Sequence, residues 1–211
     1  MNLAEMRTRV RRDLHDEDAG NYRWADSELD RHIEHALRGF SLAVPLQAKA
    51  TLTTSAGSRD LSLSSLSGLV AVEAVEYPVG YYPPRYVRFS VWGSTLTMLI
   101  DSAPSGVENA YLYYGKLHTL DSQTSTIPTP LEDVVAIGAE AYAAIEWASY
   151  ATNRVNLGGD ETWSHYLTWG QEHLAEFAQA LAHYGRRNAL RVRQLYRPFE
   201  PPANQSTDWG P

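Results

Sequence analysis

Residues 129–151 read TPLEDVVAIGAEAYAAIEWASYA, and this stretch decides the fold class. Thr129 is the expected N-cap, Pro130 suits the first helical position, and Glu132 follows the cap by three residues. The interior is rich in alanine, and side chains this small let a neighbouring helix approach closely. The stretch therefore predicts a long helix that packs against a second helix.

That second helix follows after a turn expected at residues 156–160. Beyond the turn, apolar and small side chains recur at steps of three and four, which is typical of a helix-pairing seam. The seam consists of Trp163, Leu167, Gly170, Leu174, Phe177, Leu181 and Tyr184. We expect the two helices to form an antiparallel hairpin within residues 123–185.

Two shorter amphipathic helices precede the hairpin, at residues 2–15 and 26–44. Asn2 and Glu5 have the spacing of a capping pair, and Pro45 ends the second helix. This helical pair, in residues 1–47, completes a four-helix core together with the hairpin.

Between the helices, residues 48–122 change to a period of two with Gly, Pro and Ser turns, which predicts a small antiparallel β insertion. Within residues 86–92, Val87, Phe89 and Val91 alternate with more polar side chains, so one face of this strand should pack. The turn at residues 81–85 carries aromatic side chains that indicate a contact surface. The expected strands are residues 50–53, 59–63, 69–77, 86–92, 95–101 and 109–115. The fold class is α+β, mainly α, with a four-helix core, an inserted β domain and an extended C-terminal tail.

The amino-acid composition excludes several kinds of functional site. The 211 residues include 18 basic and 25 acidic side chains, a formal charge of −7, and no cysteine. Disulfide scaffolds, thiolate metal sites and cysteine nucleophiles are therefore excluded. The N-terminus lacks the apolar run of a secretory signal, and no window has the roughly 20 apolar residues of a spanning helix, so we expect no membrane partner.

No catalytic, cofactor or metal site is predicted. The sequence has no phosphate loop, dinucleotide fingerprint, GxSxG or HExxH motif. Glu132, Glu140 and Glu146 are interpreted as structural, and the acidic turn at residues 15–21 as solvated. The histidine pairs His32 with His35 and His165 with His173 lack further spaced ligands.

The last 26 residues, 186–211, differ in character from the rest. Arginines cluster in the first half, prolines follow, and a segment so rich in proline has little use for a core. Its aromatic side chains favour an arm that orders against a partner. The candidate binding residues are Arg186, Arg187, Arg191, Arg193, Leu195, Tyr196, Arg197, Phe199 and Trp209.

Local strings and the order of elements carry a family signal. The string Tyr22-Arg23-Trp24-Ala25-Asp26-Ser27-Glu28-Leu29 opens the second helix, and Ile127-Pro128 opens the alanine-rich helix. This order resembles the head-to-tail connector proteins of tailed phages, the adaptors that dock beneath the portal, over about residues 2–197. Ala25 departs from the pattern, because many relatives have a capping serine or threonine there.

The resemblance implies a non-enzymatic virion protein of the head-to-tail neck, made in the host cytoplasm. It implies a ring, expected to be dodecameric, that contacts its own copies, the portal protein and the next neck or tail protein. Residues 186–211 would dock on the portal, and double-stranded DNA would pass the ring without specific binding. The alternatives are a stopper or tail-completion protein of the same neck and, from another class, a cell-wall hydrolase that uses the helix carboxylates.

Overall fold

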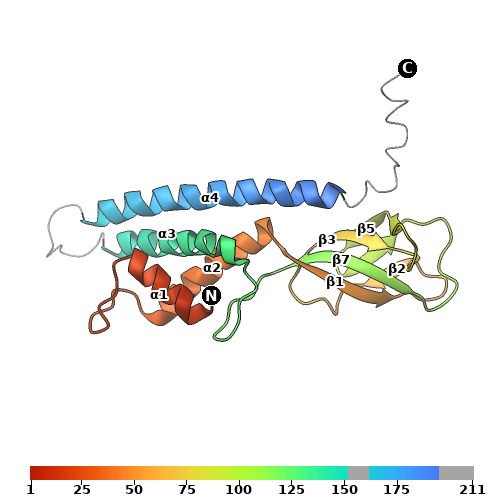
Figure 1. The fold of residues 1–211 in the computed structure, drawn as a ribbon, viewed down its shortest axis with the longest axis horizontal. Coiled ribbons are helices and arrows are strands. Elements are labelled where there is room, and N and C mark those ends of the chain that lie inside the picture. Colours follow the sequence, from red (N-terminus) through yellow and green to blue (C-terminus); the bar gives the residue numbers. More distant parts are fainter. Residues whose placement is uncertain (152–161, 195–211) are drawn as a thin grey trace, which may run out of the picture. The chain divides into compact units, whose positions relative to one another are not determined.

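The computed structural model describes residues 1–151 and 162–194 and divides the chain into two compact units (Figure 1). A helical unit comprises Met1–Leu46 and Leu117–Gly185, and a β-rich unit comprises Gln47–Lys116 together with the chain from Arg186 onward. The predicted mixed α+β class is confirmed. Residues 117–122, expected within the β insertion, belong to the helical unit. The turn predicted at residues 156–160 lies outside the described residues.

Four α-helices are described, close to the positions expected from sequence periodicity. They are α1 (Leu3–Asp13), α2 (Asp26–Ala43), α3 (Glu132–Ala151) and α4 (Thr162–Gln194). The largest difference is the end of α4, because residues 186–194 were expected to belong to an extended arm and are helical. Arginine, alanine, leucine and glutamine are good helix formers, and the first proline beyond Gly185 is Pro198, so nothing stops the helix earlier.

One of the two predicted helix caps, at Asn2, is present, and the other, at Thr129, is not. The Glu5 backbone N–H donates to Asn2 Oδ1 at 3.0 Å, and the Asn2 N–H donates to Glu5 Oε2 at 2.8 Å, which is the predicted capping box. The expected cap at Thr129 is absent, because a 3₁₀ turn, Thr129–Leu131, precedes α3 with Pro128 at its N-cap. Pro128 has φ −59° and ψ 129°, and its carbonyl accepts from the Leu131 N–H, so the chain turns one residue earlier than predicted.

The core of the helical unit draws side chains from all four helices and depends on the small residues of α3. Its fully buried members include Met6, Leu29, Phe40 and Val135, and the ring of Phe177 on α4 completes it. A Cβ placed on Gly138 would lie 2.9 Å from the Phe177 ring and 3.0 Å from Ala36 Cβ of α2. The close approach expected from the small residues of α3 therefore occurs at this glycine.

Alanine at Gly138 is expected to destabilise the protein by about 1–3 kcal/mol, because the ring of Phe177 cannot retreat within a packed core. Alanine at Gly39 of α2 should instead stabilise it by about 0.5–1 kcal/mol, since its Cβ would meet the same ring at an ordinary 3.6 Å and alanine favours the helix. Urea unfolding of both variants measures the two effects. If both substitutions change the free energy of unfolding in the same direction, this description of the packing around Phe177 is wrong.

The β-rich unit contains two antiparallel sheets with the strand orders β1-β7-β3-β4 and β2-β6-β5. Residues 86–92, expected as one strand, form two, because Tyr86–Val87 pairs with β3 and Phe89–Trp92 pairs with β6. Val91, expected to face inward, is exposed, and Phe89 is the residue of β5 that is partly buried. The seven strands are β1 (Leu46–Thr53), β2 (Asp60–Ser62), β3 (Leu69–Glu76), β4 (Tyr86–Val87), β5 (Phe89–Trp92), β6 (Thr95–Met98) and β7 (Asn109–Lys116).

Candidate assembly interface

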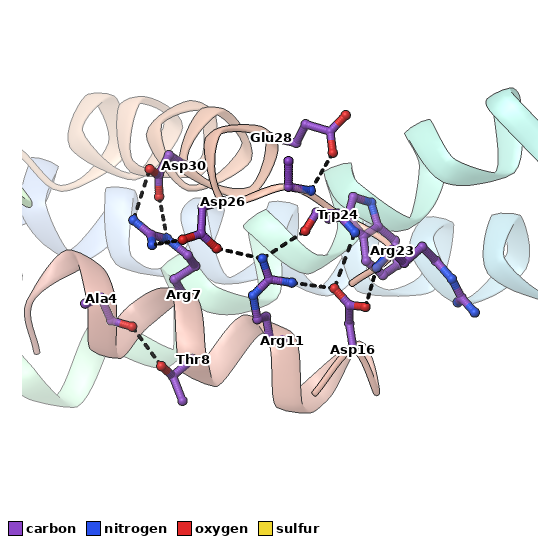
Figure 2. Close-up of polar contacts among 11 residues, drawn as sticks. Ala4, Arg7, Thr8, Arg11, Asp16, Arg23, Trp24, Asp26, Glu28 and Asp30 are labelled. Carbon is purple, nitrogen blue, oxygen red and sulfur yellow. Dashed lines mark hydrogen bonds and ion pairs between the residues drawn. The ribbon is translucent and has the colours of Figure 1, made fainter. Parts of the chain in front are cut away.

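A buried arginine ties the end of α1 to the start of α2 (Figure 2). The guanidinium of Arg11 forms an ion pair with Asp16, donates to the Trp24 carbonyl at 2.8 Å and donates to Asp26 Oδ1 at 2.7 Å. Arg7, one turn earlier on α1, pairs with Asp26 and with Asp30. We call Arg11, Asp16, Trp24 and Asp26 the N-terminal clasp, and it sets the direction in which α2 leaves the turn.

The role of Asp16 corrects an expectation. Its carboxylate was interpreted as solvated with the rest of the acidic turn, but it is buried and accepts from the backbone N–H groups of Arg23, at 2.6 Å, and Trp24, at 3.3 Å. A buried carboxylate is stable only when it is paired and hydrogen-bonded, and Arg11 with these two amides meets that need. The sequence feature that could have revealed this ion pair is Arg11 in the last turn of the first helix, followed directly by an acidic turn.

The clasp holds Trp24 in an aromatic cluster of the helical unit. The Trp24 ring centroid lies 5.7 Å from that of Trp147 on α3 and 6.3 Å from that of Tyr166 on α4. The guanidinium of Arg23 lies over Trp147 and Tyr166, 5.1 and 5.0 Å from the two ring centroids. Trp24 therefore joins three helices, and its place in the family signal is explained by packing rather than by binding.

Glu28 and Leu29, which also belong to the signature string, have structural roles as well. Glu28 Oε2 accepts a hydrogen bond from the Ala25 N–H at 2.7 Å. The carboxylate therefore provides an acceptor for a backbone N–H group at the start of α2, although Ala25 offers no side-chain cap. Leu29 is fully buried in the helical core. The departure from the family pattern at Ala25 leaves the helix start unchanged, because α2 begins at Asp26.

The candidate portal-binding residues are only partly described. Arg186 and Arg187 are exposed near the end of α4. Arg191 Nη2 lies 2.6 Å from Glu73 Oε1 of β3, so this arginine already has a partner within the β-rich unit. Arg193 lies on α4, and its side chain is not described. Leu195, Tyr196, Arg197, Phe199 and Trp209 lie outside the described residues.

The carboxylates considered for catalysis have separate structural contacts. Glu132 is buried and accepts from the Met1 amine at 2.6 Å, and Glu146 accepts from Arg31 at 2.6 Å, which lowers the pKa of Glu146. Glu140 is buried beside Asp13, and this burial raises its pKa to about 8.

The histidines do not assemble a metal site in the described part of the chain. His35 stacks on Tyr142 with centroids 4.0 Å apart, and His173 Nδ1 lies 3.1 Å from the Trp169 carbonyl oxygen. His32 is buried, and this burial lowers its pKa; its Nε2 lies 2.8 Å from Glu146 Oε2, at an angle too poor for a hydrogen bond. These side chains serve packing in the helical unit.

Exposed aromatic side chains gather in the β-rich unit, as the sequence predicted for residues 81–85. Tyr82 is 99% exposed and Trp92, at the end of β5, is 91% exposed. The guanidinium of Arg85 lies 3.9 Å from the ring centroid of Tyr81. Large aromatic side chains exposed to water are typical of an interaction surface.

Among the described residues, no helix is long and apolar enough to span a membrane. No curated protein matches the chain. Two solved structures resemble it: "Neck of empty GTA particle computed with C6 symmetry" has 12% identity and a TM-score of 0.31, with 80% of this chain and 88% of that chain covered. "Neck of native GTA particle computed with C12 symmetry" has 12% identity and a TM-score of 0.29, with coverages of 79% and 86%.

The family assignment rests on a family model. The model described as "SU10 adaptor protein" matches residues 1–202, which include the signature from Tyr22 to Leu29 and every described helix and strand. The resemblance to phage adaptors drawn from the sequence is confirmed, and the chain belongs to the SU10 adaptor protein family.

Proposed function

We propose that this protein is a structural adaptor of a phage neck that assembles as a dodecameric ring between portal and tail. The family match over residues 1–202 is the observation that carries the proposal. The surfaces of the two units suit it, because the helical unit is organised by internal packing while the β-rich unit presents exposed aromatic side chains.

Docking on the portal is assigned to the C-terminal part of the chain. Arg186 and Arg187 are exposed on α4 and precede residues 195–211, which bring one further arginine and three aromatic side chains. Aromatic and arginine side chains are the usual anchors of protein interfaces. Arg191, paired with Glu73, has the different task of fixing the base of this segment to the β-rich unit.

The charge distribution suits a channel through which DNA passes. Each chain carries a formal charge of −7, so a ring of copies becomes strongly negative. Such a wall repels phosphate, so double-stranded DNA passes without being bound. A structural role also agrees with the separate internal partners of Glu132, Glu140 and Glu146.

The test is mass photometry of the protein mixed with the portal ring of its own phage. The full chain should add many copies to each portal. A variant truncated after Gln194 should lose this binding, because it lacks the aromatic anchors but keeps all of α4. This truncation is preferable to one at Arg186, which would remove the ion pair between Arg191 and Glu73.

The matched pair of substitutions is R187A and R12A, since both arginines are exposed and lie on helices. R187A should weaken portal binding and R12A should leave it unchanged. Failure of the full chain to bind the portal at micromolar concentration would contradict the adaptor proposal and favour the stopper or tail-completion role.

A further inference from the structure

The strongest unexplained surface lies along residues 78–92, which we call the aromatic segment. It contains five aromatic side chains, two arginines and no acid. Tyr82 and Trp92 are almost completely exposed, so no described part of the same chain covers them. Exposed aromatic side chains of this kind are typical of a surface that binds another molecule.

The aromatic segment is also the free edge of both sheets. β4 is the edge strand of the four-stranded sheet, and β5 is the edge strand of the three-stranded sheet. Arg85 and Arg88 are exposed between these positions, and neither forms an ion pair with a described residue. The guanidinium of Arg85 also lies over the ring of Tyr81, so a cation and an aromatic side chain share this part of the segment.

A surface of opposite charge exists on the same chain. Residues 117–185 contain nine acids and a single arginine. Glu132, Glu140 and Glu146 are engaged inside the helical unit and do not contribute to this surface, which therefore rests on carboxylates of α4. On α4, Glu172 and Glu176 are exposed one turn apart, and no basic residue lies on this helix before Arg186. Like charges four residues apart destabilise a helix, and no ion pair in the described residues relieves this acidic pair.

We propose that the aromatic segment of one copy docks on the acidic pair of α4 of a second copy, with Arg85 and Arg88 facing Glu172 and Glu176 and with Tyr82 and Trp92 covered at the contact. Two different surfaces of the same chain meet in this arrangement. A contact of this heterologous kind generates a closed ring when its rotation closes. The inference rests on the proposed ring and names the surfaces that would build it.

Charge complementarity favours a second copy over other occupants. The aromatic segment needs an acidic partner, and the helical unit supplies one at the same concentration as the segment itself. DNA is a less suitable partner for this segment, because the net charge of −7 on each chain repels phosphate groups near the ring.

The experiment exchanges the charges. Variant R85E/R88E and variant E172R/E176R should each reduce self-association, measured by sedimentation velocity at low salt, by at least about tenfold. The quadruple variant carries both exchanges and should recover most of the wild-type association. The control E17R/E34R changes two other exposed carboxylates by the same amount and should associate like the wild type.

A second pair of variants tests the apolar part of the contact. Y82S and W92S alter side chains that make almost no contact with the described residues, so folding measured by circular dichroism should be unchanged. Both should weaken self-association and reduce the number of copies loaded on each portal ring, and 0.5 M salt should weaken the wild-type association.

The outcomes separate this contact from portal docking. If the charge variants associate and load the portal like the wild type, or if the quadruple variant stays as defective as its parents, the proposed contact is wrong and the adaptor role stands. If the wild type self-associates through these residues but ignores the portal, the contact holds and the adaptor role fails. Absence of association in both assays, or crosslinking of Trp92 to portal or DNA alone, overturns the contact.

Discussion

Arg11→Ala is expected to lower the free energy of unfolding by about 3–5 kcal/mol, the cost typical of breaking a buried ion pair from one side. The guanidinium is buried, and its removal leaves the buried Asp16 without its counter-charge and the Trp24 carbonyl without its donor. Because the clasp positions Trp24, the tryptophan contact with Trp147 should loosen as well. Urea unfolding followed by tryptophan fluorescence measures both effects.

Two further variants define the cause. R11K keeps the charge but has one ammonium group in place of the planar fork, so it cannot satisfy Asp16, Asp26 and the Trp24 carbonyl together and should recover only part of the loss. R12A removes an exposed neighbour whose ion pair with Glu17 is 3.7 Å long, and it should change stability by less than about 0.5 kcal/mol. If R11A and R12A lower the free energy of unfolding by similar amounts, the N-terminal clasp does not stabilise the protein more than an exposed ion pair does.

Glu140→Gln is expected to remove a large pH dependence of stability. The Glu140 side chain is buried on α3, its Oε1 has no hydrogen-bond partner among the described residues, and burial raises its pKa from 4.5 to about 8. Nearby Asp13 and Glu176 add to this rise in pKa, and Arg9 opposes it. The folded state therefore holds a proton that the unfolded chain gives up near pH 4.5.

The sign of the effect follows from the raised pKa. The stabilisation by this proton is complete below pH 4.5 and is lost as the pH rises toward 8. Each pKa unit corresponds to about 1.4 kcal/mol, so the loss reaches at most about 5 kcal/mol. The glutamine variant has no proton to lose, so its free energy of unfolding should vary less between pH 5 and pH 9, and at pH 9 it should exceed that of the wild type.

The matched control for this prediction is E146Q. Glu146 lies six residues further along α3 but is partly exposed, and Arg31 lowers its pKa, so its contribution is lost toward acid pH instead. The E146Q variant should keep the alkaline loss of stability seen in the wild type. An E140Q variant with the same alkaline loss as E146Q would mean that Glu140 is already ionised in the folded state.

Much of the architecture could be predicted from local sequence. The capping box of Asn2 and Glu5, the helix after Trp24 and the small residues facing α4 follow from hydrogen-bonding groups and spacings that lie within a few residues of each other. The family signature was also readable, because it is a short string with a fixed place in the order of elements. Such local patterns bias the backbone whatever surrounds them.

The interface residues were harder to predict, because their setting depends on distant neighbours. Val91 fits the inward face of an alternating strand in the sequence, but it is exposed because the described residues cover that face of β5 only at Phe89. Arg191 looked like a free binding residue until its ion pair with Glu73 was located 118 residues away in the chain. The end of α4 was also missed, since the change of composition at Gly185 does not interrupt the helix.

The sequence by itself determined the α+β class, the positions of most helices and strands, and the adaptor family, since periodicity, capping and short motifs act over one or two turns. Only the tertiary structure decided which charges are paired, buried or exposed. Asp16 became a buried partner of Arg11 while Glu172 and Glu176 stayed in water. The physical reason is that the free energy of a charge depends on its distance to other charges and to solvent, and the folded chain alone sets these distances.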